Sequence, residues 1–172
     1  MSELQQILQH LRQPEYVHVV LNPLPVYLTA AGVLALAMAL LLRSRQAQLV
    51  SLIVVLIGCA AVWPVVYYGQ AGYDRVSSMS NPDAQQWLDV HMKRAEQSSP
   101  LFYAIAALAL AAIVLPWKFP NTATPLAAAT LVFAVIAIGL GGWISHAGGQ
   151  VRHSEFRAEP PSQSTEHHEH HH

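Results

Sequence analysis

Four apolar runs without a charged residue dominate this sequence. They cover residues 25–42, 49–68, 101–117 and 125–144, and each is 17 to 20 residues long. A helix rises about 1.5 Å per residue, so each run is long enough to cross a hydrocarbon core of roughly 30 Å. Backbone polar groups must be satisfied internally in lipid, and these runs lack the alternation of barrel strands. We therefore expect an all-α integral membrane protein, folded as an antiparallel four-helix bundle.

Four crossings sort the polar residues by side. The short connectors 43–48 and 118–124 hold three basic residues and no acidic residue. Both termini and the segment 69–100 meet at the other face, which carries all ten acidic residues and all ten histidines. Function is therefore expected at this histidine-bearing face.

The short connectors also predict an orientation, since short cytoplasmic loops of membrane proteins are rich in Lys and Arg. This rule makes both connectors cytoplasmic and both termini periplasmic. The opposite face holds six Lys and Arg residues in its longer segments. A raw count therefore favours the reverse orientation, which stays open as the alternative.

The chain divides into three parts. Residues 1–14 contain a Ser2/Gln5 capping box and apolar residues at helical spacing, which predict an interfacial amphipathic helix. Residues 15–157 form the transmembrane domain. Residues 158–172 are rich in Pro and Ser and end in a histidine-rich stretch, which predicts a disordered tail that is either native or a purification tag.

Several breaks are expected within the transmembrane domain. Pro23 and Pro25 should kink the first helix. Gly69 to Gly72 reads as a loose turn, and Asn81-Pro82 as the start of an external helix over about 82–98. Ser98-Ser99-Pro100 should then bend the chain into the third crossing.

Four histidines lie near the expected helix ends. His146 and His153 are seven residues apart, with Gly149 between them to admit a flat ligand or a second helix, while His91 and His18 come from other helices. Imidazoles from different bundle helices commonly hold haem iron or a transition metal. We rank His91 and His153 first as ligands and His146 and His18 second, with His91, His153 and His146 as the metal set. Polar side chains at helix ends are the simpler interpretation of each alone.

Arg152 is the candidate partner for an anionic group, such as a haem propionate or a lipid or quinol head group. A surface ion pair with Glu155 is the competing interpretation. The sequence contains no phosphate-binding glycine loop, paired apolar carboxylates or two-cysteine metal motif. Independent enzymatic activity and nucleic-acid binding therefore have no support in the sequence.

Three stretches resemble a bacterial family of four-helix membrane proteins, akin to domain of unknown function 2231. They are His18-Val-Val-Leu-Asn-Pro-Leu-Pro25, His91 with Ala95, and the segment 146–157, which reads His-Ala-Gly-Gly-Gln-Val-Arg-His-Ser-Glu-Phe-Arg. Pro23 replaces a second histidine of the family pattern and Met92 an acidic residue, which weighs against a ligand on the first helix. The resemblance implies a bacterial inner-membrane location. Related domains are sometimes joined to Rieske-type domains, which favours electron transfer.

The sequence thus predicts a small membrane protein that binds haem b or a transition-metal ion, as an electron-transfer or quinol-interacting subunit with a redox protein as partner. The competing hypothesis is a cofactor-free structural or assembly subunit of a larger membrane complex or homo-oligomer. Its small-residue fourth helix would then be the docking face.

Overall fold

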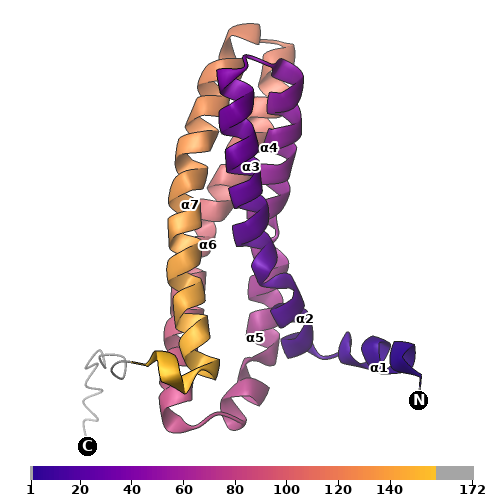
Figure 1. Ribbon diagram of the computed structural model, residues 1–172, viewed down its shortest axis with the longest axis vertical. Helices are drawn as coiled ribbons and strands as arrows, with labels where there is room; N and C mark the ends of the chain where they lie inside the picture. Colours follow the sequence, from indigo (N-terminus) through magenta and orange to yellow (C-terminus); the bar gives the residue numbers. More distant parts are fainter. Residues whose placement is uncertain (1, 158–172) are drawn as a thin grey trace, which may run out of the picture.

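The fold is all-α and consists of four long antiparallel rods (Figure 1), seen in a computed structural model that describes residues 2–157. The helices are α1 (Glu3–His10), α2 (Pro14–Leu21), α3 (Pro23–Leu41), α4 (Arg45–Ala60), α5 (Val62–Ser78), α6 (Pro82–Val114) and α7 (Ala123–Arg152). Short 3-10 turns occupy Leu115–Trp117, Pro120–Thr122 and Ser154–Phe156. The pairs α2–α3 and α4–α5 each form one rod, and α6 and α7 form the others. The expected four-helix bundle is confirmed.

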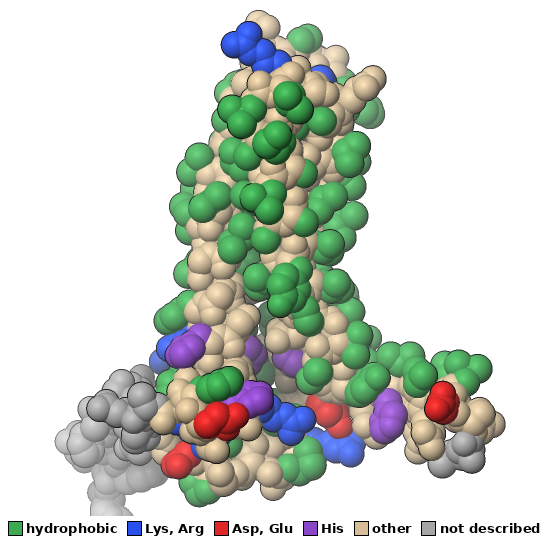
Figure 2. Space-filling view, in the orientation of Figure 1, with side chains coloured by type: hydrophobic (Ala, Val, Ile, Leu, Met, Phe, Trp, Pro, Cys, Tyr) green, Lys and Arg blue, Asp and Glu red, His purple; other side chains and the backbone are tan. Residues whose placement is uncertain are grey.

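Each rod is long and apolar enough to cross a membrane. The four stretches are 28, 34, 36 and 33 residues long, with a mean hydropathy of 2.1 to 2.7 over their most apolar windows. Since about 20 residues suffice for a crossing, the rods extend beyond the hydrocarbon region. Large apolar side chains cover the outer surface of the bundle, whereas acidic and histidine side chains gather at its lower end (Figure 2). An apolar exterior of this extent suits contact with lipid.

The interior is packed with small and aliphatic residues. Leu36, Leu52 and Val55 are fully buried, and they belong to one core cluster with alanines of α6 and α7. In α7, Ala127, Ala134 and Ala137 are all 0% exposed. Small residues at these positions let the helix backbones approach closely.

Prolines account for the interruptions within the first two rods. α2 ends at Leu21 and α3 begins at Pro23, as the sequence predicts. α4 ends at Ala60 and α5 begins at Val62, shortly before Pro64. Proline has no N–H to donate to the carbonyl one turn earlier, so the regular helix is interrupted there.

The loose turn expected at residues 69–72 is absent, because α5 continues through it to Ser78. Packing explains the difference. A Cβ atom on Gly69 would lie 2.9 Å from Nδ1 of His18, and one on Gly72 would lie 2.9 Å from the backbone nitrogen of Glu15. The two glycines therefore serve a close approach of α2 to α5 and do not form a turn.

At Ser98–Pro100, where a bend between two helices is expected, the structure has no helix boundary. Residues 82–98 are helical as predicted, with the Asn81 side chain accepting a hydrogen bond from the Ala84 N–H, but they are the first half of the continuous α6. Pro100 cannot donate to the carbonyl of Glu96, and the Ser99 hydroxyl donates to that carbonyl at 3.0 Å. This replacement hydrogen bond lets the helix pass through a proline.

The N-terminal segment forms α1, and its capping box is present as expected. α1 extends sideways from the histidine-bearing end of the bundle (Figure 1). Its apolar residues Leu4, Ile7, Leu8 and Leu11 are about half exposed or more, from 48% to 65%. The predicted tail, residues 158–172, lies outside the described residues.

Candidate functional site

A cavity of about 850 Å³ opens within the histidine-bearing end of the bundle. Residues of α2, α5, α6 and α7 line it, so every rod contributes to its wall. Most of the wall is apolar, as in the segments around Val65, Leu88 and Phe102. Cavities of this size, with apolar walls and a few polar groups, are typical of sites for small molecules and cofactors.

His18 enters the cavity wall from α2. Its Nδ1 donates a hydrogen bond of 2.8 Å to the backbone carbonyl of Val65 on α5. A backbone carbonyl accepts only, so the proton of this bond belongs to Nδ1. Within residues 2–157 no hydrogen bond to Nε2 of His18 is formed, and this nitrogen keeps its lone pair in the neutral imidazole.

His91 enters the wall from α6 and is only 8% exposed. Its Nδ1 donates a hydrogen bond of 2.9 Å to the backbone carbonyl of Ile144 on α7. Nε2 of this imidazole likewise has no hydrogen-bond partner in the described part of the chain. His91 is thus fixed in the same way as His18, on the other pair of rods.

Glycines make both hydrogen bonds possible. In a helix, the side chain four residues ahead leans back over a given carbonyl group. That position is Gly69 for the Val65 carbonyl and Gly148 for the Ile144 carbonyl. A Cβ atom would lie 2.9 Å from His18 Nδ1 at Gly69 and 3.1 Å from His91 Nδ1 at Gly148. Both carbonyls are therefore open to an imidazole from the neighbouring helix.

The two imidazoles lie next to each other. Their ring centroids are 6.2 Å apart, and the ring planes are inclined at 80°. Imidazole nitrogens bind metals at about 2.0–2.1 Å, so two imidazoles on opposite sides of one metal ion have centroids about 6 Å apart. The centroid separation of His18 and His91 is close to this value, which is one condition for a shared metal ion. Metal-binding histidines also commonly donate their other N–H to a backbone carbonyl.

The remaining predicted site residues lie at the margin of the cavity or outside it. Gly149, Arg152 and His153 line the cavity, whereas His146 does not. The side chain of His153 is 53% exposed, and its Nδ1 lies 2.9 Å from a carboxylate oxygen of Glu155. His146 is exposed too, with Nε2 3.4 Å from the amide nitrogen of Gln150. The structure therefore brings His91 together with His18, and not with His153 or His146.

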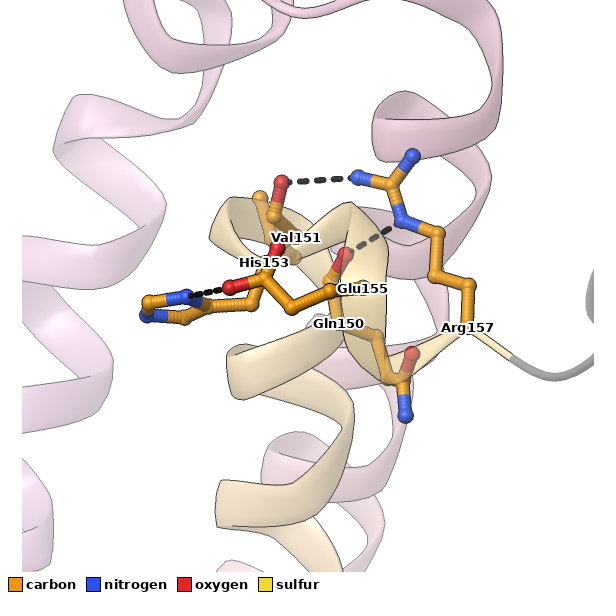
Figure 3. A network of polar contacts seen from close by, with 5 residues as sticks. All are labelled: Gln150, Val151, His153, Glu155 and Arg157. Atoms are coloured by element: carbon orange, nitrogen blue, oxygen red, sulfur yellow. Dashed lines mark hydrogen bonds and ion pairs between the residues drawn. The ribbon is translucent and has the colours of Figure 1, made fainter.

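The end of α7 explains the outward position of His153. α7 ends at Arg152, and His153 has an extended backbone, so it no longer follows the helical spacing from His146. Arg157 folds back and donates to the carbonyls of Gln150 and Val151 at 2.6 and 3.0 Å, which caps the helix. Figure 3 shows the imidazole of His153 and the guanidinium of Arg157 on opposite sides of this helix end.

Polar contacts between helices surround the cavity. Arg75 of α5 forms an ion pair of 2.8 Å with Glu15 of α2, and Tyr73 of α5 donates a hydrogen bond to Asp89 of α6. The guanidinium group of Arg152 forms no ion pair or hydrogen bond with another residue of the segment 2–157, although Arg152 lines the cavity. The anionic partner predicted for Arg152 from the sequence stays a prediction.

Within residues 2–157 no group of three or more His, Cys, Asp or Glu side chains is arranged to hold a metal ion. The pair His18 and His91 is the arrangement present. Two imidazoles suffice for a haem, because the porphyrin supplies the other four nitrogen ligands. A zinc site, by comparison, normally uses three or four protein ligands.

Comparison of the chain with family models, curated proteins and solved structures found no match. The sequence pattern ranks His18 below His153, and it does not single out Gly69 or Gly148 as contacts of the histidines. One signal was present: each of His18 and His91 follows a valine, and the two glycines lie in the rods that follow them.

Proposed function

We propose that this membrane protein binds a haem b, or alternatively a transition-metal ion, between His18 and His91. The observation that carries the proposal is the matched arrangement of the two imidazoles, each fixed through Nδ1 to a backbone carbonyl and 6.2 Å apart. When bound, such a group would supply one-electron redox chemistry. The protein would then serve as a small electron-transfer or quinol-interacting subunit in the lipid membrane.

Further features of the cavity support a haem. Its apolar wall would exclude water from a hydrophobic ring, and its volume of about 850 Å³ lies in the range typical of cofactor sites. Gly149 lines the cavity without a side chain, and Arg152, which also lines it, could neutralise a propionate. The resemblance to the family of domain of unknown function 2231 is consistent with this proposal and remains a prediction.

We further propose a bacterial inner-membrane location with both termini in the periplasm. The support is the acid-free, basic end of the bundle formed by Arg43, Arg45 and Lys118. The cavity would then open on the periplasmic side, where quinol-oxidising partners and small redox proteins have access to it.

An absorption spectrum tests the cofactor proposal. Protein purified from haem-replete cells, or incubated with haemin, is expected to show a Soret band that is weakened or shifted in His18→Ala and His91→Ala. His146→Ala is the matched control, since His146 is exposed and does not line the cavity. Elemental analysis for copper, iron and zinc covers the metal-ion alternative. Colourless protein that takes up neither haemin nor a metal ion would refute the proposal.

A cofactor-free structural or assembly subunit is the second candidate function, and one observation favours it. A Cβ atom on Gly139 or Gly142 would meet nothing within 4 Å, so both glycines lie on the outer face of α7. Such small residues permit close approach of another helix, from a larger complex or a second copy. Crosslinking through a cysteine at position 139, in a variant without Cys59, would test this contact.

A further inference from the structure

Each half of the chain contains one histidine, one carbonyl acceptor and one glycine in the same arrangement. In the first half, a histidine of one helix donates to the carbonyl of Val65, and Gly69 lies four residues beyond that carbonyl. In the second half, His91 donates to the carbonyl of Ile144, and Gly148 again lies four residues beyond. The same three parts recur in the same order along the chain.

The buried positions of the first rod and of α6 are related by one constant spacing along the sequence. His91 lies 73 positions after His18. Every buried residue of α3 has a buried counterpart in α6 at this same spacing of 73, from Ser98 to Ala112. The buried residues of α3 are Pro25, Thr29, Gly32, Val33, Leu36 and Ala39.

The second rod and α7 show the same relation. Gly148 lies 79 positions after Gly69. At this spacing, each buried residue of α7 between Ala127 and Gly141 has a buried counterpart in α4 or α5. These counterparts are Gln48, Ser51, Val55, Gly58 and Val62. The core and the histidine site therefore repeat together, although the residue types differ.

From these two registers we infer that the chain is a tandem pair of equivalent histidine-bearing hairpins, and that a bound haem is ligated symmetrically by one imidazole from each. The inference rests on the proposed function and makes it more specific. Each hairpin supplies one imidazole, which donates to a backbone carbonyl and packs against a glycine four residues beyond that carbonyl. His18 and His91 would together supply both protein ligands of a bound haem, which would leave no position for an exogenous ligand such as carbon monoxide.

Symmetry also constrains how the two ligands contribute. His18 and His91 are held by bonds of 2.8 and 2.9 Å to carbonyl groups in equivalent positions. Loss of either imidazole should therefore have the same type of effect: one vacant axial position on the iron. A site with one true ligand and one bystander histidine would respond to only one of the two substitutions.

The test uses the full chain in detergent, loaded with haemin. The wild-type protein is expected to give a six-coordinate, low-spin spectrum that does not change when carbon monoxide is added to the reduced form. His18→Ala and His91→Ala should each yield a form that binds carbon monoxide, and added imidazole should restore the wild-type spectrum in both. His146→Ala should behave as wild type.

The outcomes distinguish haem binding itself from symmetric ligation by His18 and His91. Failure of the wild-type protein to bind haemin removes the haem form of the proposed function and this inference with it, and leaves only the metal-ion alternative, which elemental analysis tests. Haemin binding with a carbon monoxide response in the wild type, or a changed spectrum in only one of the two histidine variants, overturns the symmetric ligation alone. The carbon monoxide measurement on the wild-type protein needs no variant, so a carbon monoxide response would overturn the inference even where a substitution prevents folding.

Discussion

A methyl group on Gly148 would lie 3.1 Å from both Nδ1 and Cε1 of His91. This is closer than van der Waals contact, and the imidazole also holds a hydrogen bond to Ile144 one turn away. A side chain at position 148 would therefore have to displace the histidine or the helix. The glycine is required by the position of a neighbouring side chain and not by a turn, since α7 continues to Arg152.

Gly148→Ala is expected to weaken haemin binding and to reduce stability. Overpacking a tight contact costs about 1–3 kcal/mol, which outweighs the gain of roughly 1 kcal/mol from replacing glycine by alanine in a helix. Gly139→Ala is the matched control, because a Cβ atom there meets nothing within 4 Å. Thermal unfolding in detergent and haemin titration should separate the two variants. Equal behaviour of both would show that His91 moves without consequence.

Ser99→Ala should destabilise α6 at Pro100 by about 1 kcal/mol, the typical contribution of one hydrogen bond. The Ser99 hydroxyl is the donor to the Glu96 carbonyl, which Pro100 cannot serve. Ser98→Ala is the control, since Ser98 is similarly buried at 7% and its hydroxyl makes no hydrogen bond within residues 2–157. Hydrogen exchange across residues 95–103 measures the effect. An unchanged exchange rate in Ser99→Ala would mean that the helix passes Pro100 without this bond.

Arg45→Ala should destabilise the basic end of the bundle. Nη2 of Arg45 donates to the carbonyl of Ala112 at 3.0 Å, and this carbonyl has lost its usual helical donor because position 116 is proline. A hydrogen bond from a charged donor contributes about 1.5–3 kcal/mol. The exposed Gln46 provides the control, and Gln46→Ala should change stability by less than about 0.5 kcal/mol. Thermal unfolding of both variants decides between these expectations.

The fold was predictable because its main cause is local. Four long apolar runs leave few alternatives in lipid, and Pro23 and Asn81 mark helix boundaries by their own backbone chemistry. Of the two wrong boundaries, the first has a tertiary cause and the second a local one. Gly69 to Gly72 stays helical because α2 packs against it, and the chain passes Pro100 because Ser99 replaces a lost donor. The contact of α2 with α5 cannot be derived from the residue types alone, whereas the hydrogen bond of Ser99 lies within one turn of α6.

The site was predictable only in part. The gathering of histidines at one end follows from the even number of crossings. Which of them meet depends on the rotation of each helix about its axis and on where α7 ends, and His153 leaves the helical path at that end. The internal duplication is hidden for a related reason. Packing preserves buried positions and not residue types, so Thr29 corresponds to Phe102.

The orientation of the bundle can be tested by cysteine labelling in intact cells. The variants Gln46→Cys and Asn121→Cys, each combined with Cys59→Ala, place a thiol at exposed positions of the basic end. A membrane-impermeant maleimide is expected not to react with either, because short basic loops stay in the cytoplasm. Ala71→Cys provides the matched positive control, since Ala71 is exposed on α5 toward the histidine-bearing end, and it should react readily. Labelling after cell lysis must succeed for all three variants. Labelling of positions 46 and 121 in intact cells, without labelling of position 71, would reverse the topology and place the cavity on the cytoplasmic side, where its redox partner would have to be a cytoplasmic protein.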